Sequence, residues 1–181
     1  LRWHQIPNMR RMTTGIHAYG ALASAELNHG GFMSTPLNGG EVPGPCACTL
    51  KNGYEVREMN EEEMNLIADY FADAAEVCAA GNFDIINVHA GHGWLLGQFF
   101  SPVTNKRTDQ YGGTIENRAR FPKMVLQRIR DRIGDSMLIK IRFSASELCE
   151  GGYEIEEAIK TIQYLQDVVD MVQCSVGTLS D

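Results

Sequence analysis

Strand-like and helix-like segments alternate along this chain of 181 residues, and this alternation limits its fold more than any other feature. Short apolar or β-branched runs predict strands at 21–27, 83–88, 137–143 and 170–174. Apolar residues at helical spacing predict helices at 11–19, 60–80, 115–133 and from Ile155 onward. Strands separated by helices form parallel sheets with helical crossovers, so the sequence predicts an α/β fold.

Local signals place several boundaries of these elements. Asn60 is predicted to cap the second helix, because Glu63 follows three residues later in a capping-box pattern. Gly81 is the expected stop of that helix. The Gly/Pro-rich stretch 32–58, in contrast, is predicted to be a long irregular loop over an active site.

The predicted strands and helices amount to about half of a (β/α)8 TIM barrel, which in complete form needs about 250 residues. A half-barrel would leave strand edges and an apolar inner face uncovered. The chain also begins at Leu1 rather than Met and ends soon after a strand. We therefore expect a truncated or incomplete barrel over residues 1–181, completed by self-association or by a missing barrel half.

Composition and charge disfavour several classes of partner. The net charge of −7 argues against nucleic acid, because phosphate binding needs a basic surface. No apolar run is long enough to span a bilayer, and the N-terminal residues lack a signal-peptide pattern. The cysteines lack the spacing of zinc or iron–sulfur ligands, so we expect reduced thiols and a cytoplasmic location. Two of them, Cys78 and Cys174, are expected to be core residues.

Two histidines, His89 and His92, follow the predicted strand 83–88 directly. In barrels built from βα units, the loops at the carboxyl ends of the strands converge over the barrel mouth, where catalytic residues lie. The two imidazoles are therefore candidate site residues. The alternative is that both are core histidines with satisfied hydrogen bonds.

The motif around them reads Asn87-Val-His-Ala-Gly-His-Gly-Trp-Leu-Leu-Gly97, followed by Gln98-Phe-Phe-Ser-Pro102, 104–113 and Glu116-Asn-Arg118. It resembles the pattern of the old yellow enzyme family of flavin-dependent ene-reductases, near its bile-acid-inducible and 2,4-dienoyl-CoA reductase-like members. The resemblance runs from about Arg11 to Cys174. It implies a partial FMN-binding domain with about the third to sixth strands of a TIM barrel. It also implies NAD(P)H as hydride donor and reduction of the C=C bond of an α,β-unsaturated carbonyl compound.

The resemblance assigns roles to individual residues. His89 and His92 match the pair that hydrogen-bonds the substrate carbonyl oxygen, where hydride addition builds enolate charge. Arg142 matches an arginine near flavin N1 and the C2 carbonyl, where a cation stabilises the reduced flavin. An ion pair of Arg142 with Glu26 or Glu147 is the alternative.

Two positions depart from the family pattern. Glu26 stands where the family often has a glutamine that contacts the flavin pyrimidine edge, so the local charge balance changes. Trp94 stands where many members have the tyrosine that protonates the substrate α-carbon. Indole cannot act as that acid, so Trp94 would shape the pocket while water or another residue supplies the proton. Tyr111 is a possible donor, but the role expected of it is structural.

Other parts of the family pattern lie outside these residues. They include the phosphate-binding loops, the first flavin-contacting strand, and the cysteine cluster and second dinucleotide domain of larger members. Without a phosphate site, FMN affinity should fall, because charge-assisted contacts to the phosphate are lost. The alternative function is therefore a non-catalytic barrel fragment that cannot hold FMN alone.

Three further patterns indicate either a structural role or a different kind of binding site. The loop 105–113 is assigned a structural role, with expected ion pairs of Arg107 with Asp109 and of Glu116 with Arg118 or Arg120. The glycines at 91–97 resemble a dinucleotide-binding motif only weakly, because Ser101-Pro102 interrupts the helix that should follow. His89 and His92 could bind a metal with His17 or His29, but no carboxylate or cysteine completes a ligand set, so no metal is expected.

Overall fold

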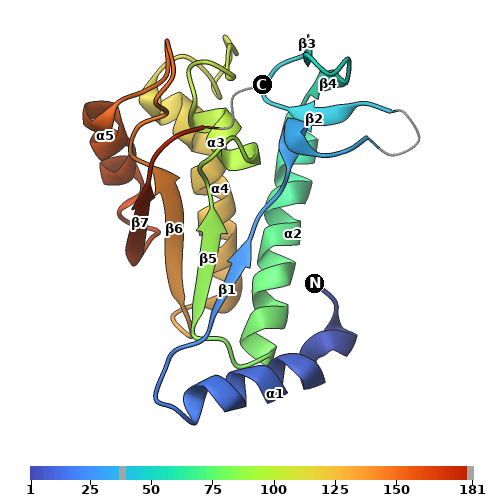
Figure 1. Ribbon diagram of the computed structural model, residues 1–181, viewed down its shortest axis with the longest axis vertical. Coiled ribbons are helices and arrows are strands. Elements are labelled where there is room, and N and C mark those ends of the chain that lie inside the picture. The colour runs from blue at the N-terminus through green and yellow to red at the C-terminus, as the bar shows by residue number, and fades with distance from the viewer. Residues whose placement is uncertain (37–39, 179–181) are drawn as a thin grey trace.

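A parallel four-stranded sheet forms the centre of the computed structural model, which describes residues 1–36 and 40–178 (Figure 1). Its strands are β1 (Ser24–Leu27), β5 (Ile85–His89), β6 (Leu138–Ser144) and β7 (Met171–Ser175), in that spatial order. Each strand is hydrogen-bonded in parallel to the next one along the chain. This is the arrangement of neighbouring strands in a (β/α)8 barrel, and it confirms the predicted α/β fold.

The crossover helices form one layer against this sheet. They are α2 (Glu61–Ala80), α4 (Ile115–Ile133) and α5 (Ile155–Leu165), and α4 packs between the other two behind β5 and β6 (Figure 1). Buried residues of the layer include Phe71, Phe121 and Leu126, which lie in one cluster with Ile86 and Ile139 of the sheet. Burial of this apolar surface is the main force that holds the helices on the strands.

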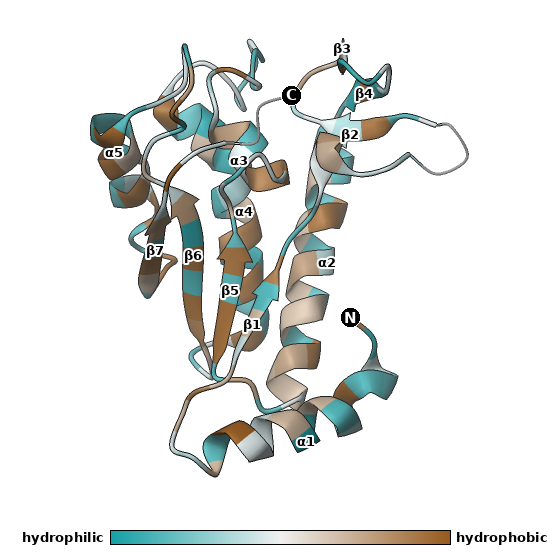
Figure 2. Cartoon of the chain, in the orientation of Figure 1, coloured by the Kyte–Doolittle hydropathy of each residue, from teal (hydrophilic) through white to brown (hydrophobic). Residues whose placement is uncertain are grey.

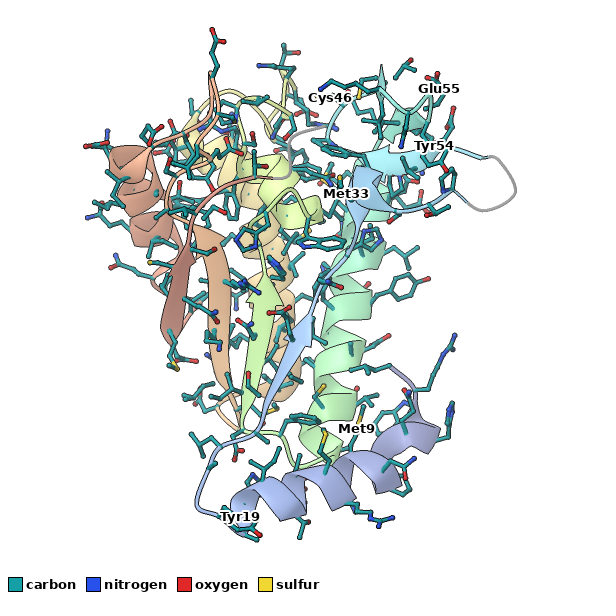
Figure 3. All side chains as sticks on the ribbon, viewed as in Figure 1. Met9, Tyr19, Met33, Cys46, Tyr54 and Glu55 are labelled. Carbon is teal, nitrogen blue, oxygen red and sulfur yellow. The ribbon has the colours of Figure 1, made fainter. Side chains whose placement is uncertain are left out.

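The predicted signals at the ends of α2 are confirmed. Asn60 Oδ1 accepts from the Glu63 amide at 2.9 Å, and Glu63 Oε2 accepts from the Asn60 amide at 3.0 Å. These two bonds satisfy amides that the helix itself leaves without acceptors. At the other end, Gly81 contacts Met9 closely, since a Cβ at Gly81 would lie 2.9 Å from Met9 Cβ (Figure 3). Helix α1 is therefore packed on the C-terminal end of α2.

Helix α1 begins earlier than predicted, at Ile6–His17 rather than at Arg11, and follows a short 3-10 turn at Trp3–Gln5. Pro7 explains the difference, because proline is favoured in the first turn of a helix, where its missing N–H costs no hydrogen bond. The short helix α3 (Leu95–Phe100) was not predicted either. Its six residues are all buried, so it lacks the amphipathic pattern by which a surface helix is found.

The stretch 32–58 is not a wholly irregular loop, so that prediction was wrong. A 3-10 turn at Gly31–Met33 precedes a second, small sheet in the order β2-β4-β3. Its strands are β2 (Val42–Gly44), β3 (Cys48–Thr49) and β4 (Glu55–Glu58), and Figure 3 marks this layer with the labels Cys46, Tyr54 and Glu55. Strands this short, one of them containing Pro43, give no alternating pattern to detect.

Arg107 anchors the small sheet to the rest of the chain. Its Nη1 donates to the carbonyl oxygens of Pro45 and Met59, both at 2.9 Å, and its side chain is 7% exposed. The guanidinium also forms the predicted pair with Asp109. Because Pro45 and Met59 lie near the two ends of the segment that contains β3 and β4, one side chain fixes both ends.

The predicted pairs of Glu116 were wrong. Arg118 pairs with Glu157 of α5 and donates through Nε to the Phe100 carbonyl, while Arg120 donates to the Gln110 carbonyl. Arg118 is buried between α4, α5 and the end of α3, so acceptors from other elements outcompete a neighbour on its own helix.

The inner face of the sheet is polar rather than apolar, which corrects a second expectation. Glu26, Asn87 and Lys140 align across β1, β5 and β6, and the next layer contains His89 and Arg142. Teal bands across β6 in Figure 2 mark this alternation of polar and apolar residues. Branched apolar residues dominate the interior of most TIM barrels, so the polar character of this face is unusual.

Cys174 was expected in the core but is exposed, whereas Cys78 is fully buried as predicted. Cys174 lies on β7, the edge strand of the sheet, and contributes with Val172 to an open apolar groove beside Ile155 and Ile159 of α5. Helix α5 therefore covers this face of β7 only in part, and Val172 and Cys174 remain exposed. The prediction from apolar character alone therefore overestimated the burial of this strand.

In the part of the chain that the structure describes, no helix combines the length and apolar character needed to cross a membrane. The longest helix, α2, carries three glutamates in its first turn.

Replacing Arg107 should destabilise the fold more than replacing an exposed arginine. Arg107→Ala leaves two buried carbonyl oxygens without their charged donor, so we expect a loss of about 2–3 kcal/mol in the free energy of unfolding. Urea denaturation followed by circular dichroism would measure it. Arg132→Ala, which removes surface pairs with Asp73 and Glu76, should leave the midpoint nearly unchanged. Equal effects of the two variants would contradict the anchoring role.

Candidate active site

The candidate site lies at the carboxyl end of β5, where the strand register brings polar residues together. His89 is the last residue of β5 and pairs in register with Arg142 of β6. Arg142 pairs in turn with Gln173 of β7. His89 is 4% exposed, so its ring is enclosed by the protein. The end of the sheet thus presents an imidazole and a guanidinium side by side.

The loop after β5 turns sharply on the end of β6. The Ala90 amide donates to the Arg142 carbonyl at 2.8 Å, which continues the strand pairing by one residue. His92 then adopts a left-handed backbone with φ of 54°, and Gly93 follows with φ of 75°. Gly91 must be glycine, because a Cβ there would lie 2.8 Å from Ser144 Oγ. The loop therefore fits closely over Ser144.

This turn brings the two histidine rings together. His92 Nδ1 lies 3.4 Å from His89 Nε2, and the rings are perpendicular with centroids 5.1 Å apart. At this separation a single ligand oxygen can lie within hydrogen-bonding distance of both nitrogens. The structure therefore brings the side chains of His89 and His92 together, as predicted.

The backbone sets the tautomer of His89. Its Nδ1 accepts from the Gly91 amide at 3.4 Å, so the proton of the neutral ring belongs on Nε2. His89 then presents an N–H donor towards His92. Burial lowers the pKa of His89 and of His92 and so favours the neutral rings. The nearby Arg142 cation also lowers both pKa values, and the Glu26 carboxylate opposes this in part.

Trp94 borders the pair and is the N-cap residue that precedes helix α3. Its indole lies 6.1 Å from the His89 ring at 60°, an edge-on contact. Gln98 of α3 fixes the neighbouring loops, since its Nε2 donates to the carbonyls of Gly30 at 3.0 Å and Gly93 at 2.7 Å. The Leu95 amide also donates to the His29 carbonyl at 2.9 Å. The loops after β1 and β5 are thus joined into one rigid wall.

A second polar group lies one layer deeper, on the inner face of β1, β5 and β6. Asn87 Nδ2 donates to Glu26 Oε2 at 2.7 Å, and Arg142 Nη1 lies 3.7 Å from the same oxygen. The ion pair considered as the alternative role of Arg142 therefore exists with Glu26. Glu147 is engaged elsewhere, because its Oε2 accepts from the Ser101 hydroxyl at 2.9 Å. The pair with Glu26 is long and leaves other atoms of Arg142 available.

Two buried polar atoms of this group have no hydrogen-bond partner among the described residues, Asn87 Oδ1 and Arg142 Nε. Unpaired buried donors and acceptors are costly, and they are uncommon in folded proteins. Here one acceptor and one donor lie beside the carboxylate of Glu26. This set matches a planar heterocycle that carries adjacent carbonyl and N–H groups, such as the pyrimidine edge of a flavin.

His17, which was considered as a metal ligand together with His89 and His92, lies away from them. His17 pairs with Asp84 at 2.8 Å, and Asp84 lies just before β5, at the opposite end of that strand from His89. The described residues contain no cluster of three side chains suited to a metal. Tyr111, considered as a proton donor, is buried in the loop after α3 with Arg107 over its ring.

Sequence reasoning missed three residues of this site: Asn87, Gln98 and Ser144. Asn87 could have been found, because it lies two residues before His89 and must share its face of the strand. Gln98 and Ser144 act through contacts between segments far apart in the chain, 68 residues in the case of Gln98 and Gly30. No local pattern reveals such contacts.

Comparisons with known proteins found relatives in sequence and in structure. A family model described as "NADH:flavin oxidoreductase / NADH oxidase family" matches residues 3–180. A NADH oxidase of Thermoanaerobacter brockii is 37% identical over 171 residues, which cover 92% of this chain and 26% of that protein. The chain spans between about a quarter and a half of the length of the curated relatives it matches.

Solved structures show the same fold. Histamine dehydrogenase from Rhizobium sp. 4-9 has a TM-score of 0.88 at 28% identity, covering 97% of this chain and 27% of that one. The old yellow enzyme homologue from Zymomonas mobilis has a TM-score of 0.80 at 27% identity, covering 94% of this chain and 52% of that one. The chain is therefore part of a TIM barrel of this type.

His89 and His92 should titrate below the ordinary histidine pKa of 6.5. Because the pKa is lowered in the folded state, the unfolded chain binds more protons, and stability falls as the pH drops below 6.5. Ring-proton chemical shifts measured by NMR between pH 4.5 and 8 would give both midpoints. A midpoint above 6.5 for either ring would contradict the neutral pair.

Proposed function

The chain belongs to the NADH:flavin oxidoreductase / NADH oxidase family, and from this premise we propose that it forms part of an FMN-dependent NAD(P)H oxidoreductase. We further propose that its reaction is reduction of the C=C bond of an α,β-unsaturated carbonyl compound. The observation that carries this proposal is the geometry of the His89/His92 pair, whose facing nitrogens lie 3.4 Å apart next to Arg142.

Arg142 and Glu26 are the residues that would hold the flavin ring. When bound, FMN supplies hydride transfer from a reduced nicotinamide to the substrate. Arg142 Nε is a buried donor without a partner among the described residues, and it suits a carbonyl or ring nitrogen acceptor. Glu26 would accept from a ring N–H, while its charge offsets that of Arg142. The opposite charges of Glu26 and Arg142 would then nearly cancel beside the flavin ring.

His89 and His92 would bind the substrate carbonyl oxygen. As negative charge develops on that oxygen, donors already in place stabilise it without reorganisation, and the loss of one such donor typically costs about 10²–10³ in rate. Burial lowers the pKa of both imidazoles and so favours their uncharged form, while Arg142 next to the pair adds positive potential. Neutral donors bind a carbonyl without attracting anions from solution.

Trp94 would form the wall of the substrate pocket. Its indole N–H can donate a hydrogen bond but cannot deliver a proton at neutral pH. Its edge-on contact with His89 gives that ring a fixed apolar neighbour. The proton for the α-carbon would therefore come from water or from another residue, and a planar substrate would lie beside the indole.

A second candidate is a non-catalytic portion of a barrel that supplies these residues but does not hold FMN by itself. It is favoured by the four strands of the sheet and by coverage of at most about half of each curated relative. The two candidates differ in one property, the affinity of the chain for FMN.

A flavin titration distinguishes them. We expect saturable quenching of FMN fluorescence by the purified chain, and Arg142→Ala should weaken binding about tenfold or more because a charge-assisted contact is lost. Arg132→Ala serves as the control, since it removes an arginine from the far side of the helix layer. No saturable quenching by a folded chain would support the non-catalytic candidate.

The double variant His89→Ala/His92→Ala should retain FMN binding but lose affinity for phenolic ligands. Removal of two donors to a phenolate oxygen is expected to weaken binding by about tenfold or more, as measured by calorimetry on the flavin-loaded protein. His17→Ala is the control, because that histidine pairs with Asp84 at the other end of the sheet. Unchanged affinity in the double variant would refute the assignment.

A further inference from the structure

Ser144, the last residue of β6, connects three strand ends. Its hydroxyl lies 3.3 Å from the His92 amide nitrogen, in the loop after β5, and 2.8 Å from the Gly177 carbonyl oxygen, in the segment after β7. Ser144 is 1% exposed, so water does not compete for these contacts. No other buried hydroxyl in the described residues joins the loops after both β5 and β7.

The two contacts fix the direction of each hydrogen bond. A hydroxyl has one proton, and a carbonyl oxygen can only accept, so Ser144 donates to Gly177. Its oxygen is then left as the acceptor for the His92 N–H. Each bond favours the other, because donation to a carbonyl increases the negative charge on the hydroxyl oxygen.

The residue held by this hydroxyl is the one with an unfavourable backbone. His92 has φ of 54°, in the left-handed region that residues with a side chain adopt infrequently. Such a conformation persists where surrounding contacts determine it. The direct contact of Gly91 with Ser144 adds a second constraint, since even a Cβ at Gly91 would collide with Ser144 Oγ.

We infer that Ser144 is a positioning residue for the histidine pair: its hydroxyl holds the His92 amide in the left-handed turn that brings Nδ1 within 3.4 Å of His89 Nε2. Through Gly177, the same hydroxyl couples this geometry to the segment after β7. The inference rests on the proposed function, because it assigns Ser144 to the oxygen-binding pair described there.

Ser175 supplies a matched control. It lies beside Ser144 in the register of β6 and β7, and its hydroxyl donates to the Phe143 carbonyl at 3.3 Å. Ser175→Ala therefore removes a hydroxyl of the same kind, at the same level of the sheet, without touching the histidine loop. Ser144→Ala removes the hydroxyl that contacts the histidine loop.

The experiment records ¹⁵N–¹H correlations of the histidine rings in the free chain at pH 7.5, for the unmodified protein and both variants. In the unmodified chain we expect each of the two rings to hold one fixed tautomer, with His89 protonated at Nε2. Ser144→Ala should abolish this pattern, so that the nitrogens of His92 average between tautomers. Ser175→Ala should retain it, and thermal melting confirms that each variant is folded.

The inference is overturned if folded Ser144→Ala keeps the ring pattern, or if both variants lose it equally. It is also overturned if the unmodified chain already shows averaged tautomers at His92, a result that does not depend on the variants. None of these spectra requires flavin. A failure of FMN binding would therefore count against the proposed function and not against the role of Ser144.

Discussion

The register between β5 and β6 is the constraint on which the rest of the site depends. It places His89 opposite Arg142, and the Ala90 amide extends the pairing with a bond of 2.8 Å to the Arg142 carbonyl. A slip of one residue would turn both side chains to the helix layer, because successive residues of a strand face opposite sides. The buried residues Ile86, Val88, Ile139 and Ile141 prevent that slip, since it would expose them.

The core and the candidate site thus lie on opposite faces of the same strands. One face carries branched apolar residues against α2 and α4, and the other carries charged and amide groups. Arg142 is shared between structure and proposed chemistry, because its carbonyl orders the loop while its guanidinium meets Glu26. The position of the donors is therefore fixed by packing on the opposite side of the sheet. This arrangement suits a site that must be organised before its substrate binds.

Much of this fold could be predicted from the sequence, because its main elements carry strong local signals. The capping box at Asn60 and the periodicity of α2 and α4 located two helices almost to the residue. His89, His92 and Arg142 were predicted from strand ends and the motif, and they do lie together. The exposure of Cys174, the small sheet within 32–58 and the contacts of Ser144 depend on tertiary packing, so local patterns could not reveal them.

We propose that, with flavin bound, this site supports hydride transfer to an activated alkene. Anaerobic visible spectroscopy of the flavin-loaded protein tests it most directly. NAD(P)H is added until the flavin absorbance is bleached, and an enone such as 2-cyclohexenone is then added. The account predicts that the oxidised flavin spectrum returns with formation of the saturated ketone. A flavin that stays bleached in the presence of excess enone would contradict it.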